Sequence, residues 1–257
     1  MAETQPAPEP KTSDLGTRAL SAVVMVAVAG TALWLGGWWW TVFVAAVALG
    51  VLWEWWGLVK GFSSSDVRRT LWTVGGVGYL AVGSCVLLMM IYDFEGAGRV
   101  LLIVGAVVCT DIGAYFAGRL IGGPKIAPAI SPSKTWAGLF GGMVGASLAL
   151  GLIGSAWYSG LCDVFYPHTS RFGFDGPCGS YIKIFPWSHQ LLWATIAGSL
   201  IATVAQSGDF FESWMKRKAG VKDSGNLIPG HGGLFDRVDG LLAVVFAIGA
   251  LGLLFGR

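Results

Sequence analysis

Long apolar stretches, separated by short polar segments, run along almost the whole chain. A bilayer core about 30 Å thick needs roughly 20 mostly apolar residues for one helical crossing. Stretches of this length occupy residues 18–36, 38–58, 70–92, 98–118, 136–157, 189–208 and 239–256. The pattern therefore predicts an all-α fold, a polytopic integral membrane bundle of about seven transmembrane helices.

Composition supports this class of protein. Of the 257 residues, 54% are hydrophobic and only 12% are charged, whereas about a quarter of the residues of an ordinary soluble domain are charged. Residues 1–16 are polar and rich in proline, which predicts a disordered tail. Because they include neither a basic start nor an evident cleavage site, the first apolar stretch is predicted to remain as a signal anchor.

The distribution of charge predicts the orientation. The net charge of +2 is too small to suggest nucleic acid as a partner. If the N-terminus is cytoplasmic and the seven spans alternate, the cytoplasmic side holds all of the 17 Lys and Arg residues except Arg99, Arg171, Lys183 and Arg257. Positive residues concentrate on the cytoplasmic side of membrane proteins. The N-terminus and the longer polar loops are therefore expected in the cytoplasm.

Two smaller features carry structural interpretations. Glu54 stands among Trp53, Trp55 and Trp56, which are interpreted as an aromatic belt at headgroup level, so Glu54 is interpreted as an interfacial residue. Cys162 and Cys178 share the long outer loop, where an oxidising compartment would permit a disulfide. Whether they pair stays open.

Acidic residues collect next to two predicted spans on the cytoplasmic side. Asp209, Glu212 and Ser213 share one helix face if the sixth span continues as a helix, and Asp236 and Asp239 are three residues apart at the start of the last span. Ionisable groups at the membrane are costly, which favours a functional role. Oxygen ligands select hard cations, and Mg²⁺ is commonly held by one or two carboxylates together with substrate phosphates.

Basic and small residues around these acids predict phosphate binding. The glycines of "PGHGG" at residues 229–233 permit close backbone approach to an anion, and His231 can donate a hydrogen bond to a phosphate. In the other cytoplasmic loop, "SPSKTWAG" precedes the fifth span, and a helix N-terminus attracts phosphate. The spacing is not that of a P-loop. The proposed phosphate contacts are Ser131, Ser133, Lys134 and Thr135 from that loop, and Lys216, Arg217, Lys218, Lys222 and Arg237 from the second.

Structural roles stay open for several of these residues. Residues 216–218 resemble an ordinary cytoplasmic membrane flank, and Asp111 could simply pair with Arg119. His231 could be a loop spacer, and Asp239 could cap the last helix. A capping role is less suitable for Asp209, because it lies towards the end of a helix, where the dipole disfavours an anion.

Residues 213–239, "SWMKRKAGVKDSGNLIPGHGGLFDRVD", resemble the signature of the phosphatidate cytidylyltransferases, also called CDP-diacylglycerol synthases. "TDIGAYFAGRLIG" and "SPSKTWAG" also look like segments of this family, whereas the first three spans add only hydrophobicity. The signature positions are Ser213, Lys216, Arg217, Lys222, Asp223, Gly225, Pro229, His231, Gly232, Gly233, Asp236, Arg237 and Asp239.

The resemblance implies a homodimeric enzyme of the bacterial cytoplasmic (inner) membrane, although family members often have more spans. It would join CTP to phosphatidic acid, giving CDP-diacylglycerol and pyrophosphate. The family's paired metal-site aspartates fall on Asp209 and Asp236, with Mg²⁺ as cofactor and K⁺ as a candidate second cation. Residues 17–97 would form the N-terminal helices, and residues 98–257 the catalytic region. Catalytic roles would fall on Lys222, Asp223, His231, Arg237 and Asp239, and substrate binding on Asp111, Arg119, Ser131, Ser133, Lys134, Thr135, Ser213, Lys216, Arg217, Gly232 and Gly233.

Two other functions are compatible with parts of the sequence. An ion-coupled transporter could also place carboxylates in the membrane, but its acids would cluster near mid-membrane in two matching halves. A CDP-alcohol phosphotransferase needs an Ala-Arg after its Asp-Gly, and "DGLLAVVF" at residues 239–246 lacks the arginine. Both rivals fit the sequence less well than the cytidylyltransferase.

Overall fold

The computed structural model describes residues 15–92, 96–156 and 187–255. Within these ranges the chain is helical and contains no β-strand, and seven helices are long and apolar enough to cross a membrane. The predicted all-α, seven-span architecture is confirmed. The helices are α1 (Leu15–Leu35), α2 (Gly37–Phe62), α3 (Asp66–Tyr92), α4 (Gly96–Leu120), α5 (Trp136–Ala156), α8 (Trp187–Ala219) and α9 (Phe235–Phe255).

The helix ends differ most from the prediction around the acidic residues. Helix α8 continues to Ala219 instead of ending near residue 208, and α9 begins at Phe235 instead of residue 239. Gly220, with φ of 72°, ends α8 in a left-handed turn whose N–H groups bond the last carbonyls of the helix. Hydropathy misses these polar extensions because it detects only the apolar part of a helix. The predicted tail lies outside the described residues apart from residues 15–16, as do Cys162 and Cys178.

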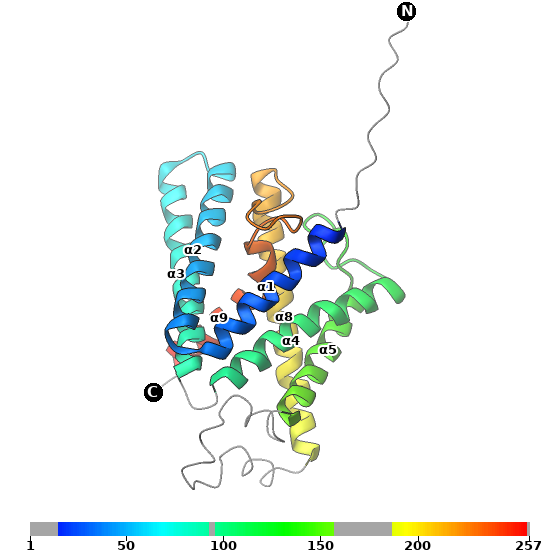
Figure 1. Ribbon diagram of the computed structural model, residues 1–257. Coiled ribbons are helices and arrows are strands. Elements are labelled where there is room, and N and C mark those ends of the chain that lie inside the picture. The colour runs from blue at the N-terminus through cyan, green and yellow to red at the C-terminus, as the bar shows by residue number, and fades with distance from the viewer. Residues whose placement is uncertain (1–14, 93–95, 157–186, 256–257) are drawn as a thin grey trace, which may run out of the picture.

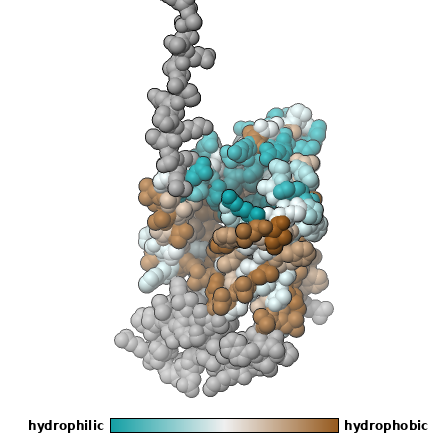
Figure 2. All heavy atoms as spheres, turned by 90° about the vertical axis from the view of Figure 1, so that its right-hand side faces the viewer, coloured by the Kyte–Doolittle hydropathy of each residue, from teal (hydrophilic) through white to brown (hydrophobic). Residues whose placement is uncertain are grey.

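The start of α1 and three connecting segments lie at the same end of the bundle. Figure 1 shows the start of α1, the α2–α3 turn, the loop at residues 121–135 and the loop at residues 220–234 together at one end. On the face drawn in Figure 2, polar side chains gather there and mostly apolar side chains cover the helices below them. We call this the polar end. The amphiphilic distribution is that of an integral membrane protein.

Close helix contacts position the two loops at the polar end. A Cβ atom added to Gly113 of α4 would lie 2.2 Å from the carbonyl oxygen of Gly141 in α5. A Cβ atom added to Gly208 of α8 would lie 2.6 Å from the carbonyl oxygen of Asp239 in α9. Small residues let transmembrane backbones approach closely. The glycine contacts therefore bring the acidic parts of α8 and α9 together.

An aromatic cluster joins α2 and α3 to the same pair of helices. Trp55 is buried, its ring lies 5.8 Å from that of Phe211 and 5.7 Å from that of Phe235, and its indole N–H donates to the carbonyl oxygen of Trp72. The interpretation of Trp55 as part of an interfacial belt is therefore wrong. Its ring instead packs α2 against α8 and α9.

Candidate active site

Three carboxylates meet at the polar end, two from α8 and one from α9. Asp209, Glu212 and Asp239 each place one oxygen within 4.8 Å of the other two. Asp209 and Glu212 share a helix face because α8 continues past them, as predicted. Asp239 faces them across the close contact at Gly208. We call these three residues the acidic cluster.

The acidic cluster has the ligand chemistry of a site for a hard cation. All three side chains offer oxygen, the ligand atom that Mg²⁺ and Ca²⁺ prefer. Glu212 is 1% exposed, and within the described part of the chain its Oε1 atom has no hydrogen-bond partner. A buried polar atom without a partner is costly. A bound cation would satisfy this oxygen and offset the repulsion among the three carboxylates.

Asp236 lies beside the acidic cluster and is engaged by protein groups. Its Oδ1 atom accepts a 2.5 Å hydrogen bond from Lys216, and its Oδ2 atom accepts bonds from the N–H groups of Ser224 and Gly233, both at 2.9 Å. Lys216 also pairs with Glu212 at 2.7 Å. The predicted metal pair of Asp209 and Asp236 is thus connected through Lys216 and Glu212. Asp236 holds the loop at residues 220–234 against α8.

Residues 216–218 divide into two classes. The side chain of Lys216 is 14% exposed and bridges two carboxylates, so the interpretation as an ordinary membrane flank is wrong for this residue. Arg217 and Lys218 are exposed, and Lys218 lies over the ring of Trp214. These two fit the flank interpretation. Lys216 differs from the two residues that follow it because its side chain points towards the start of α9, where it bonds Asp236.

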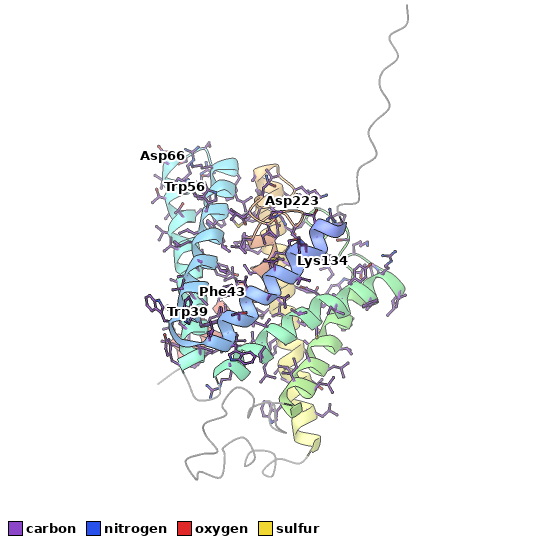
Figure 3. The ribbon with its side chains drawn as sticks, viewed as in Figure 1. Trp39, Phe43, Trp56, Asp66, Lys134 and Asp223 are labelled. Carbon is purple, nitrogen blue, oxygen red and sulfur yellow. The ribbon has the colours of Figure 1, made fainter. Side chains whose placement is uncertain are left out.

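Lys134 connects the first loop to the acidic cluster. Its ammonium pairs with Oδ2 of Asp209 and lies 5.1 Å above the ring of Phe210. Figure 3 shows Lys134 and Asp223, from separate loops, at the polar end. Asp111 of α4 is exposed and lies within electrostatic reach of Asp209, Lys134 and Arg237. The two predicted loops therefore converge on one site.

The other residues of the first loop shape it. Ser131 and Thr135 are buried, and the Thr135 hydroxyl accepts the N–H of Gly138 at 3.0 Å, which makes Thr135 the N-cap of α5. Ser133 is exposed, and its carbonyl oxygen accepts a bond from Lys125 at 3.3 Å. Four residues of this loop were predicted to contact phosphate. Two of them are available for such a contact, Ser133 because it is exposed and Lys134 because its ammonium extends to Asp209.

The second loop is tied together around His231. Arg237 donates to the carbonyl oxygen of His231 at 2.8 Å, and the His231 Nδ1 atom lies 2.7 Å from the hydroxyl of Ser21 in α1. Gly232 has φ of 79°, a left-handed conformation that favours glycine. Lys222 and Asp223 are exposed. His231 is therefore a contact between α1 and the loop, which goes beyond a spacer.

Three of the remaining predictions have direct outcomes. Arg119 donates to the hydroxyl of Tyr115 at 2.7 Å, and no ion pair with Asp111 is found within the described ranges. Asp239 is not the cap of α9, because the helix begins four residues earlier, at Phe235. Ser213 makes a long 3.4 Å hydrogen bond to Asp209.

Glu54 is the residue that the sequence interpretation placed wrongly. It is 3% exposed and lies against the second loop, so it is enclosed by protein instead of facing the lipid headgroups. Its carboxylate accepts bonds from the N–H groups of Leu234 and Phe235 and from the Ser224 hydroxyl. The available signal was an acidic residue inside an apolar span, which favours a functional interpretation.

Known proteins are similar to this chain over the segments that form the candidate site. Residues 56–255 match the Cytidylyltransferase family. A phosphatidate cytidylyltransferase of Brucella suis is 32% identical over 95% of this chain and 96% of that protein, and one of Rickettsia bellii is 31% identical over 90% and 87%. A phosphatidate cytidylyltransferase of Helicobacter pylori is 35% identical over 69% of this chain and 52% of that protein.

The family match includes both loops and every residue of the acidic cluster. The likeness to the Brucella protein extends over nearly the full length of both chains. The three acids form one cluster beside Lys134 of the first loop, which gives no support to the transporter alternative. The chain therefore belongs to the cytidylyltransferase family, among relatives that are phosphatidate cytidylyltransferases.

Proposed function

We propose that the protein joins CTP to phosphatidic acid at the acidic cluster, releasing pyrophosphate and forming CDP-diacylglycerol. The observation that carries the proposal is the convergence of Asp209, Glu212 and Asp239 with Lys134 and Lys216 at the polar end. This combination of acids and bases suits a reaction between anionic substrates. The names and coverage of the relatives support the same reaction.

Asp209, Glu212 and Asp239 would hold a divalent cation, which we propose to be Mg²⁺. When bound, it supplies Lewis-acid stabilisation of charge on the nucleotide phosphates. Asp236 was predicted as a ligand from the family resemblance, and we propose that it supports the site through Lys216. A second, monovalent cation such as K⁺ stays a prediction.

The basic residues would neutralise and orient the substrates. Lys134 already pairs with a carboxylate, so it can exchange that partner for a phosphate oxygen. Lys222 and Arg237 extend the positive charge along the second loop, and His231 is held there as a hydrogen-bonding group. Positioning and electrostatic stabilisation would then supply most of the catalysis.

The chemical step needs little proton transfer. A phosphate monoester has a second pKa near 6, so the lipid phosphate is mostly a dianion at neutral pH. One of its oxygens would attack the α-phosphorus of CTP and form the new P–O bond. The bond from the α-phosphorus to the bridging oxygen would break, and pyrophosphate would leave with that electron pair. We propose no covalent enzyme intermediate.

The position of the site suits a lipid substrate. Asp209 of the acidic cluster pairs with Lys134, whose loop lies at the polar end, so we propose that a phosphate headgroup reaches the cluster laterally from the bilayer. We propose that this end is cytoplasmic, because the positive residues predict that orientation and CTP is cytosolic. The named relatives are bacterial, which supports a bacterial cytoplasmic membrane. The homodimer, the tail at residues 1–16 and the division near residue 98 stay predictions.

Purified protein in detergent tests the proposal. With CTP, phosphatidic acid and Mg²⁺, pyrophosphate and CDP-diacylglycerol should appear together in equal amounts. Asp209→Asn and Asp239→Asn should each lower turnover about a hundredfold, equivalent to roughly 3 kcal/mol of transition-state stabilisation. Asp66→Asn is the matched control, because this acid is exposed on α3. Turnover close to that of the unchanged protein in both cluster variants would reject this assignment of the site.

A further inference from the structure

Glu54 reaches from α2 into the second loop of the catalytic half. Its Oε1 atom accepts the N–H of Leu234 at 2.8 Å, and its Oε2 atom accepts the N–H of Phe235 at 2.7 Å and the Ser224 hydroxyl at 2.9 Å. These lengths are those of charge-assisted hydrogen bonds. The residue lies outside the segment matched by the family, residues 56–255.

The carboxylate of Glu54 caps α9 from another helix. The first N–H groups of a helix have no partner within the helix, and a negative charge at that end is favourable. Helix α9 begins at Phe235, so the N–H groups bonded by Glu54 are those at its start. The position of the helix start is therefore set partly by α2.

Two glycines of the family signature are explained by the same side chain. A Cβ atom added to Gly225 would lie 2.5 Å from Oε1 of Glu54, and one added to Gly233 would lie 2.7 Å from its Oε2 atom. Neither position leaves room for a larger residue while Glu54 stays in place. The second loop folds around the carboxylate.

A short chain of contacts links Glu54 to the acidic cluster. The Ser224 hydroxyl lies between the two carboxylates, 2.9 Å from Glu54 and 3.0 Å from Asp236. Asp236 bonds Lys216, which in turn bonds Glu212 of the cluster. Asp239 lies one turn into the helix that Glu54 caps. A displacement of Glu54 would reach the acids by both routes.

We propose that Glu54 is a positioning residue for nucleotidyl transfer, which holds the second loop and the start of α9 in the arrangement that the acidic cluster requires. It would touch neither substrate nor cation. The inference rests on the proposed function and assigns a role in it to α2, at a residue outside the segment that the family matches.

The test separates positioning from general stability. Glu54→Gln keeps the shape of the side chain but turns an NH₂ group towards a backbone N–H. Val51→Ala is the control, because this fully buried residue lies one turn earlier on α2 and bears no polar group. We expect Glu54→Gln to lower kcat at least tenfold and to raise the Mg²⁺ concentration that gives half-maximal rate. Val51→Ala should lower Tm while leaving kcat per folded molecule within twofold.

Two further measurements keep the proposal testable if Glu54→Gln does not fold. Ser224→Ala removes the link to Asp236 but leaves both backbone bonds, and it should lower kcat severalfold with a nearly unchanged Tm. Amide hydrogen exchange in residues 220–234 should quicken in Glu54→Gln, relative to α4 and α5. The proposal would be overturned if Glu54→Gln or Ser224→Ala folded and kept the kcat of the unchanged protein. It would also be overturned if Val51→Ala lost as much kcat as Glu54→Gln at the same loss of Tm. If the unchanged protein gives no product, the proposed function fails. The hydrogen-exchange measurement would still test whether Glu54 holds the second loop in place.

Discussion

Replacing Lys216 with methionine should destabilise the protein more than any other single loss of charge on α8. The side chain is 14% exposed and lies between Glu212, 1% exposed, and Asp236, 9% exposed. Methionine keeps most of the apolar volume but removes the ammonium. Two buried carboxylates would then face each other, with Asp209 and Asp239 close by.

The expected loss is that of a buried ion pair with one partner removed, about 3–5 kcal/mol. For a chain of this size each kcal/mol lowers Tm by about 2–4 °C, so a fall of roughly 10 °C is expected. Lys218→Met is the control, because Lys218 is exposed and contacts only the face of Trp214 among the described contacts. Such a surface change should stay within about 0.5 kcal/mol.

Thermal unfolding of the purified variants in detergent, followed by tryptophan fluorescence, measures this difference. Adding Glu212→Gln to Lys216→Met replaces one of the two facing carboxyl groups by an amide, and the double variant should recover about 0.5–3 kcal/mol relative to additive losses. Mg²⁺ should raise Tm more in Lys216→Met than in the unchanged protein. In the variant the carboxylates have lost the ammonium of Lys216, so a bound cation would relieve more of their repulsion and stabilise the native state more. A loss of under about 1 kcal/mol for Lys216→Met would show that this ion pair is not a main support of the site.

Three further outcomes are expected. Gly233→Ala should cut turnover at least tenfold, because the new Cβ would lie 1.9 Å from the Ser224 hydroxyl. Gly252→Ala is the control and should leave turnover unchanged, because a Cβ atom there would meet nothing within 4 Å. Comparable turnover in the two variants would contradict the packing argument. Lys134→Met should raise the KM for CTP about tenfold or more, since a hydrogen bond to a charged group contributes about 1.5–3 kcal/mol; initial rates at varied CTP measure this, and an unchanged KM would exclude Lys134 from nucleotide binding. Ser64→Cys, at the exposed α2–α3 turn and in a chain whose four cysteines are replaced, should react with an impermeant maleimide in inside-out vesicles but not in intact cells; the reverse pattern would invert the proposed orientation.

The positions of the acids show where local patterns stop being informative. Spacing correctly placed Asp209 and Glu212 on one face of α8, because residues three apart on a helix are neighbours. It could not show that Asp239, and not Asp236, would complete the cluster with them. Both aspartates lie in the first turns of α9, but Asp236 is bonded by Lys216 and by the N–H groups of Ser224 and Gly233, whereas Asp239 lies one turn further along, against Gly208.

The sequence by itself determined the membrane class, the number of spans, the polar residues that belong to one end and the chemistry of the signature, because hydropathy and short spacings are local properties of the chain. Only the tertiary structure decided that Lys134 pairs with Asp209, that Lys216 bridges two acids and that Glu54 caps α9. These contacts depend on how closely helices approach at positions such as Gly113 and Gly208. Packing between residues far apart in the chain is a property of the assembled bundle, and no local pattern contains it.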